Sequence, residues 1–274
     1  MSLATRESLV RLARKYDALI ITDDVYDFLQ WPISNTASPA KDPSTLTHAL
    51  LPRLVDVDRT LEPIPGADDY GNTVSNGSFS KIAGPGVRTG WAEATPKFVY
   101  GLSQCGSSRS GGAPSQFTAA IIDSLLSSGA LSKHIETVLK PAYQKRHAFM
   151  LSAIKTHLGP LGVTVAEESL NGSDVFGGYF VWLEFPKSVN AENLAARCKK
   201  EENLVIAPGK IFQVQGDDSF EFPNSVRLCF SHEEEVDLEE GVKRMATVTK
   251  NMLRGVGGDE ATKIAMEEDL GEFQ

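Results

Sequence analysis

Apolar side chains at the start of the chain follow a helical period and then a strand-like run. The helical period rests on Leu9, Leu12, Ala13 and Tyr16. The run covers residues 18–22 and ends at Asp23 and Asp24. A continuous apolar strand beside an amphipathic helix is typical of a parallel sheet covered on both faces. Ligands of such sheets lie beyond the carboxyl ends of the strands, so the two acids are candidate site residues.

The next segment, residues 32–77, is rich in Pro, Ser, Thr, Asp and Gly and has one apolar patch, at residues 46–57. This composition predicts a long irregular connection over the surface, of a length that is often functional. From Ser115 the pattern becomes helical again, and residues 131–158 predict one long helix. Pro141 should kink this helix or start a new section of it.

The last third of the chain alternates between strand-like and helical patterns. Strands are expected at residues 162–166, 179–185, 204–208 and 225–230, and a helix at 191–201 behind an Asn190 cap. Ser231 followed by Glu234 has capping-box spacing and predicts the start of a closing helix. This alternation predicts a small α/β domain, and the polar segment after Gly255 predicts a frayed tail.

Composition narrows the class of protein. The chain has 274 residues, 41% of them hydrophobic and 23% charged, as in ordinary globular proteins. A net charge of -9 argues against a nucleic-acid or anionic-membrane partner. The three cysteines and five histidines show no spacing for disulfides or metal ligands. No apolar run approaches the ~18 residues of a membrane span. We therefore expect a cytoplasmic protein without a metal site.

Two short segments carry candidate chemistry. The first is Asp23-Asp24-Val25-Tyr26, for which the favoured interpretation by itself is a helix cap followed by a core tyrosine rather than a binding site. The second is Ser78-Phe79-Ser80-Lys81, followed by Gly84-Pro85-Gly86-Val87-Arg88-Thr89-Gly90-Trp91. Its backbone N–H groups, hydroxyls and planar guanidinium form the outline of a phosphate site. The glycine spacing is neither the dinucleotide fingerprint nor a P-loop, and a solvated Lys-Arg pair on a turn is the plain alternative.

Arg227 lies inside the predicted strand at 225–230, among apolar neighbours. A buried arginine is costly unless it is paired, so it serves either a structural ion pair or a carboxylate ligand. The strand alone favours neither reading.

Taken together, these segments resemble the class I/II aminotransferases, and most closely the branch of kynurenine and 2-aminoadipate aminotransferases with their fungal relatives. The resemblance covers roughly residues 3–253. It implies pyridoxal 5'-phosphate as cofactor, with Lys81 forming the Schiff base and Asp23 pairing with the pyridine nitrogen. It also implies that Tyr26 bonds the phenolic oxygen, that Ser78, Ser80 and Arg88 bind the phosphate, and that Arg227 takes the substrate carboxylate.

The implied chemistry explains these residue types. An ionised Asp23 would keep the pyridine nitrogen protonated, which makes the ring an electron sink. Lys81 would hold the cofactor aldehyde as a nucleophile and then carry a proton at the substrate α-carbon. The implied reaction moves an amino group between an amino acid and a 2-oxo acid in a homodimer.

The implied fold is α/β, with an incomplete large domain of mainly parallel sheet and a smaller C-terminal α/β domain. We expect the large domain at 1–130, a linking helix at 131–158, the small domain at 159–255 and a tail at 256–274. Nothing in the chain matches the family's N-terminal part, which holds further cofactor contacts. Two alternatives therefore stay open: a non-catalytic binding or dimer-partner protein, and a pyridoxal-phosphate decarboxylase or lyase. Strands without neighbours would leave edges exposed, so we also expect poor solubility or tight self-association.

Overall fold

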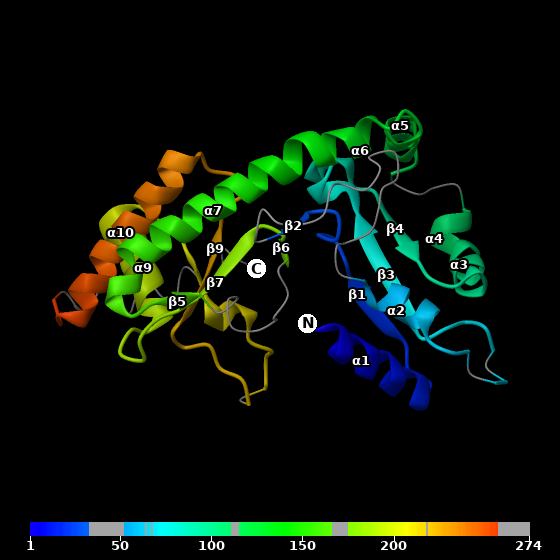
Figure 1. Cartoon of the computed structure of the whole chain (residues 1–274), viewed down its shortest axis with the longest axis horizontal. Helices are drawn as coiled ribbons and strands as arrows, with labels where there is room; N and C mark the ends of the chain where they lie inside the picture. Colours follow the sequence, from blue (N-terminus) through cyan, green and yellow to red (C-terminus); the bar gives the residue numbers. More distant parts are fainter. Residues whose placement is uncertain are drawn as a thin grey trace. The chain divides into compact units, whose positions relative to one another are not determined.

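The computed structural model describes residues 1–32, 52–63, 65–66, 68–110, 115–165, 175–217 and 219–256. These residues belong to two compact units (Figure 1). The first unit runs from Met1 to Ala142 and includes the later strand β6 (Val175–Gly177) with Gly178. The second unit begins at Tyr143 and contains the remaining strands and helices. Each unit has the mixed α/β content that the sequence predicts.

The first unit is built on a three-stranded sheet in the order β1-β3-β4. Its strands are β1 (Ile20–Asp23), β3 (Thr73–Ser78) and β4 (Gly90–Glu93). Strands β1 and β3 pair in parallel with Asp23 opposite Asn76, and β4 pairs antiparallel to β3 with Ser78 opposite Gly90. The predicted strand at 18–22 is confirmed, two residues later than expected, and its carboxyl end carries the two acids.

Two helices accompany this sheet. They are α1 (Leu3–Lys15) and α2 (Leu54–Thr60). The Ser2 side chain caps α1 by accepting from the Thr5 N–H, and α2 runs beside β3 (Figure 1). Val10, Leu54 and Val57 form the buried cluster between them, with Leu9, Ile20 and Leu61 packed against it. The predicted helical stripe was therefore only partly right, because Leu12 and Tyr16 are 52% and 66% exposed.

The prediction of an irregular connection over 32–77 was wrong for two stretches. Residues 54–60 form α2 and residues 73–77 belong to β3. Leu54, Val55 and Val57 are all buried, so one face of a short helix packs inward although the flanking sequence is polar. Tertiary burial outweighs local composition here. Residues 33–51, 64 and 67 of this segment lie outside the described residues.

A small antiparallel sheet joins two distant segments of the first unit. Strand β2 (Gln30–Pro32) pairs with β6, with Gln30 opposite Gly177. The backbone N–H of Gly178 donates to the Leu29 carbonyl at 3.0 Å. The sequence pattern did not predict either strand, since each has only three residues.

The middle of the chain is helical, with a confirmed irregularity at the proline. The helices are α3 (Pro96–Ser103), α4 (Gly106–Arg109), α5 (Gln116–Ser127), α6 (Ala130–His134) and α7 (Lys140–His157). A π-helical turn, Ile135–Leu139, lies between α6 and α7, and the Lys140 N–H donates to the Ile135 carbonyl. Pro141 has no N–H and its ring would clash one turn earlier, so widening that turn lets the helix continue.

The second unit contains an antiparallel sheet in the order β5-β7-β9-β8. Its strands are β5 (Thr164–Val165), β7 (Phe180–Glu184), β8 (Ala207–Pro208) and β9 (Ser225–Cys229). Val181, Leu183, Val226 and Leu228 alternate with outward residues and are buried. Each of the four predicted ranges contains a strand, but β5 and β8 have only two residues each, and Ala166 lies outside the described residues.

Besides most of α7, the described residues of the second unit form two further α-helices. They are α9 (Ala191–Glu202) and α10 (Glu235–Leu253), which pack against each other. The predicted Asn190 cap is confirmed, because its side chain accepts from the Asn193 N–H. The predicted cap of the closing helix was wrong: Glu234 occupies the N-cap position without a side-chain bond, and Ser231 lies before the helix. The predicted domain limits at 130, 158 and 255 stay predictions.

Candidate active site

The three-stranded sheet of the first unit has one face covered by α2 and a second face, here called the open face, that is exposed at the carboxyl ends of β1 and β3. On the covered face, the Thr73 hydroxyl donates to Asp58 of α2 at 2.9 Å. On the other face lie Asp23, Asn76 and Ser78, of which the first two are exposed and the third is half-buried. Their partners on β4 are small, since Gly90 lies opposite Ser78 and Ala92 opposite Asn76. This face therefore presents polar groups beside small residues at its carboxyl end, whereas Val74, further back on the same face, is buried.

The two adjacent acids at the end of β1 lie on opposite faces. The Asp23 side chain is on the open face, where its Oδ1 accepts from the Asn76 amide at 3.0 Å. The Asp24 carboxylate is on the covered face, where its Oδ2 accepts from the Thr22 and Ser75 hydroxyls at 2.5 and 2.6 Å. Strand alternation separates them. Only Asp23 is presented to a ligand on the open face.

Lys81 lies at the end of a short 3-10 helix, Phe79–Lys81, that directly follows β3. Its Nζ lies 5.5 Å from the centroid of the Tyr26 ring. Tyr26 belongs to the turn after β1, and Gly178 lies close to its ring, because a Cβ added to Gly178 would be 3.7 Å from that ring. The structure thus brings Tyr26 and Lys81 together, although 54 positions of sequence separate them.

The predicted phosphate-binding residues lie around the start and end of the glycine-rich turn. The Ser78 hydroxyl accepts from the Ser80 N–H at 3.1 Å and so begins the 3-10 helix. Arg88 is exposed, and its backbone has the left-handed conformation with φ 47°. Its Nη1 donates to the Pro85 carbonyl at 3.4 Å. The Phe79 N–H donates to the Thr89 carbonyl at 3.1 Å, which closes the turn. A guanidinium at the surface of such a turn can bind an anion through the N–H groups of its outer edge.

A buried charge cluster lies behind the Tyr26 turn and was not predicted from the sequence. Arg53 is 4% exposed and contacts Asp56 at 3.0 Å, Glu93 at 2.8 Å and Asp27 at 3.5 Å. Burial, partly offset by Arg53, raises the pKa of Asp27 to about 6. Asp27 Oδ1 has no hydrogen-bond partner among the described residues. The only sequence signal for this cluster is the Arg53 and Asp56 pair at one helical turn.

Arg227 belongs to the second unit, on β9. Its guanidinium lies over the Phe180 ring at 3.9 Å and the Phe212 ring at 4.1 Å. Arg227 therefore stacks on aromatic rings as a cation–π partner, which neither reading of the sequence anticipated. The N–H groups of a guanidinium lie in its plane, so stacking on its faces consumes none of them.

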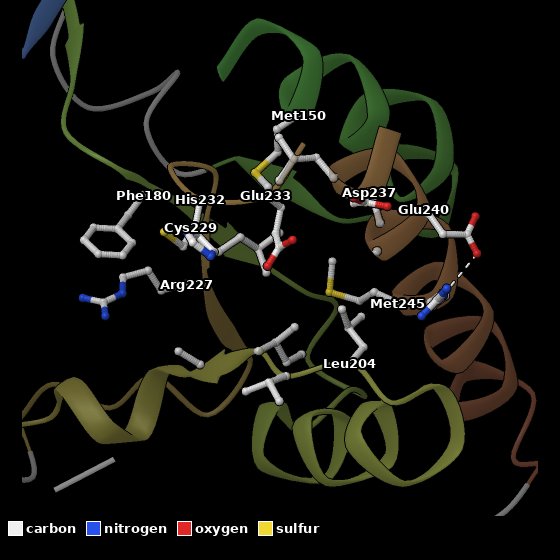
Figure 2. Close-up of a pocket in the computed structure, with 18 of the residues that line it drawn as sticks. Met150, Phe180, Leu204, Arg227, Cys229, His232, Glu233, Asp237, Glu240 and Met245 are labelled. Atoms are coloured by element: carbon white, nitrogen blue, oxygen red, sulfur yellow. Dashed lines mark hydrogen bonds and ion pairs between the residues drawn. The ribbon is translucent and has the colours of Figure 1, made fainter. Parts of the chain in front are cut away.

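A pocket of about 620 Å³ lies in the second unit next to Arg227. Figure 2 shows Arg227 and Phe180 at one end of it and Met245 with the ion-paired Glu240 towards the other. Leu204, Leu228, Val242 and Met245 give it apolar walls. Glu233, Asp237 and Glu240 also line the pocket, and Figure 2 shows the Arg227 guanidinium pointing away from these acids.

No group of three metal-ligating side chains occurs in the part of the chain that the structure describes. None of the helices among those residues is long and apolar enough to cross a membrane.

Comparison with known proteins places this chain in a family. The family model "Aminotransferase class I and II" matches residues 1–245, and the chain belongs to this family. An uncharacterized protein of Saccharomyces cerevisiae, YER152C, is 36% identical over 251 residues, which cover 91% of this chain and 52% of that protein.

Two solved structures show the same fold. The multiple substrate aminotransferase of Thermococcus profundus superposes with a TM-score of 0.70 at 28% identity, over 93% of this chain and 54% of that one. The α-aminoadipate aminotransferase LysN of Thermus thermophilus, complexed with N-(5'-phosphopyridoxyl)-L-leucine, gives 0.68 at 25% identity, over 93% and 56%. The chain thus spans about half the length of the relatives it matches.

Proposed function

We propose that this chain carries the lysine-bearing part of a pyridoxal-phosphate-dependent transaminase, which moves an amino group between an amino acid and a 2-oxo acid. The observation that carries the proposal is the open face of the β1-β3-β4 sheet. It presents Asp23 and Ser78, and Lys81 lies beside the Tyr26 ring at its end. Membership of the aminotransferase family and the phosphopyridoxyl adduct of LysN support the same chemistry.

The residues of the first unit fit pyridoxal 5'-phosphate by charge and shape. A flat aromatic ring suits a sheet face whose β4 positions are Gly90 and Ala92. Asp23 would pair with the pyridine nitrogen and Tyr26 would bond the phenolic oxygen. The phosphate would lie at the turn, held by the charge of Arg88 and by Ser78 and Ser80.

Three residues of the chain would have separate roles in the reaction. When bound, pyridoxal phosphate withdraws electrons from the substrate α-carbon. Asp23 would hold the proton on the pyridine nitrogen. Lys81 would bind the cofactor aldehyde through Nζ, and its amine, once displaced by substrate, would move the proton at the α-carbon. Arg227 would bind the α-carboxylate of the amino acid and of the oxo acid.

Covalent trapping tests this proposal. Wild-type chain is mixed with pyridoxal phosphate, reduced with borohydride and mapped by mass spectrometry. We expect one modified lysine, Lys81, and none in Lys81→Ala. Lys15→Ala is the matched control, because Lys15 Nζ also lies over a tyrosine ring, at 5.2 Å. Equal modification of many lysines, or unchanged modification in Lys81→Ala, contradicts the proposal.

Product analysis then separates the reaction types. A transaminase converts an amino acid to its 2-oxo acid with the amino group left on the cofactor. A decarboxylase would release carbon dioxide, and a lyase would release an eliminated side-chain fragment. Cofactor held at Lys81 without any of these products would favour the non-catalytic binding alternative.

A further inference from the structure

We propose that Asn76 is a positioning residue for Asp23: its side-chain amide holds one carboxylate oxygen and so orients the other towards the pyridine nitrogen of the cofactor. The inference rests on the proposed function and adds to it a residue that the sequence motifs did not include. Asn76 Nδ2 donates to Asp23 Oδ1 at 3.0 Å. The two residues are direct register partners in the parallel β1–β3 pair.

The location of Asn76 supports this role. Asp23 is the last residue of β1, and its side chain is exposed on the open face. An exposed aspartate at a strand end has several accessible rotamers, and ordering it costs conformational entropy. A cross-strand hydrogen bond selects one of these rotamers before the cofactor arrives. Preorganisation of this kind increases affinity because less ordering remains to be done on binding.

An amide is well suited to orient a carboxylate without changing its charge. Lysine or arginine at position 76 would compete with the protonated pyridine nitrogen for the negative charge of Asp23. Asn76 is neutral, and it donates a hydrogen bond that strengthens when the acceptor is ionised. The amide therefore orients Asp23 without placing a positive charge beside it.

The surroundings leave room for this arrangement. Opposite Asn76 on β4 lies Ala92, whose methyl group is too small to reach across to Asp23. The neighbouring acid, Asp24, is bound by two hydroxyls on the covered face. Each acid thus has its own hydrogen-bond donors. Thr22 and Ser75 donate to Asp24, and Asn76 donates to Asp23.

A pair of cofactors distinguishes orientation of Asp23 from general stabilisation. Pyridoxal phosphate has the ring nitrogen, whereas its 1-deaza analogue has a C–H in that position and cannot pair with Asp23. Their affinities for the full chain are measured by quenching of tryptophan fluorescence. We expect Asn76→Ala to weaken binding of pyridoxal phosphate about tenfold, as for one charge-assisted hydrogen bond, and to leave the deaza analogue unaffected.

Two further variants sharpen the test. Asn76→Asp keeps the shape but places a second carboxylate beside Asp23, so it should weaken pyridoxal phosphate binding more than Asn76→Ala does. Asn72→Ala is the matched control, because the Asn72 amide also makes one hydrogen bond, to the Ala18 carbonyl at 2.9 Å, just before β3 begins. It should change neither affinity.

Equal loss for both cofactors in Asn76→Ala, or no loss for either, would overturn the positioning role. Wild-type chain that binds pyridoxal phosphate no better than the deaza analogue would also overturn it. Absence of any borohydride-trapped cofactor on Lys81 would instead overturn the proposed function, and this inference with it. The two failures are therefore distinguishable.

Discussion

Gly77 of β3 lies directly against the indole of Trp91 on β4, and a Cβ added to Gly77 would come within 2.1 Å of that ring. The same indole packs against Phe79 at 4.7 Å and Phe28 at 5.8 Å between ring centroids. Phe79 begins the 3-10 helix that ends at Lys81. The glycine therefore lets an aromatic cluster support the segment that carries the candidate lysine.

Gly77→Ala should destabilise the first unit by about 1–3 kcal/mol, the usual cost of overpacking, because the indole must move. Urea unfolding followed by tryptophan fluorescence measures the change. Gly86→Ala is the control, since no atom lies within 4 Å of the added Cβ there. The Gly77–Trp91 contact would be disproved by equal stabilities of the two variants.

Arg53→Ala should destabilise by about 3–5 kcal/mol, because it removes the buried cation shared by Asp27, Asp56 and Glu93 and with it the counter-charge of the buried Asp27 carboxylate. Arg59→Ala is the comparison. Arg59 also contacts Glu93, at 2.6 Å, but is half-exposed, so its loss should cost at most about 1 kcal/mol. Similar losses in the two variants would argue against a buried cluster.

The free energy of unfolding should depend on pH through the ionisation of Asp27. Burial raises its pKa from 3.8 to about 6, against the opposing effect of Arg53, while Asp24 and Glu93 raise it further and the Phe28 N–H lowers it. The folded state thus binds a proton that the unfolded state has released, so the free energy of unfolding falls as the pH rises from about 4 to about 6. At about 1.4 kcal/mol per pH unit, the loss is roughly 3 kcal/mol.

Asp27→Asn should abolish this fall in the free energy of unfolding between about pH 4 and about pH 6. The variant should be at least as stable as wild type at pH 7.5. Chemical unfolding at pH 4.5, 6 and 7.5 measures it, and Glu240→Gln at an exposed carboxylate provides the control. A variant that is less stable than wild type at pH 7.5 would show that the charged Asp27 contributes favourably to the fold.

Self-association should depend on the exposed strand β1. This strand is at the end of the described sheet, and Ile21 within it is 68% exposed. Apolar side chains on a strand with an open edge favour pairing with another chain, and a charge there opposes it. Light scattering after gel filtration should show dimers or larger species for wild type and fewer for Ile21→Lys. Val205→Lys, at a 65% exposed position of the second unit, should behave as wild type. A monodisperse wild-type monomer would refute the expectation.

The periodic patterns predicted most of the long elements correctly, and the short ones poorly. Helices α1, α7, α9 and α10 each contain several turns, so their apolar positions repeat often enough to be recognised. The strands β2 and β6 have three residues each, too few for any alternation to show. The short helix α2 was hidden for the same reason, within a polar segment.

By itself the sequence determined the order of the long helices and strands and the family to which the motifs around Asp23, Lys81 and Arg88 point, because residue types and spacings are local properties. Only the tertiary structure decided which acid faces the open sheet surface. Asp23 and Asp24 are chemically equivalent neighbours, and strand pairing with Asn76 on one face and Ser75 on the other makes them different. The same holds for contacts between segments that are far apart in the chain, which no local pattern encodes. Asn76 contacts Asp23 in this way, and Arg53 contacts Asp27 and Glu93.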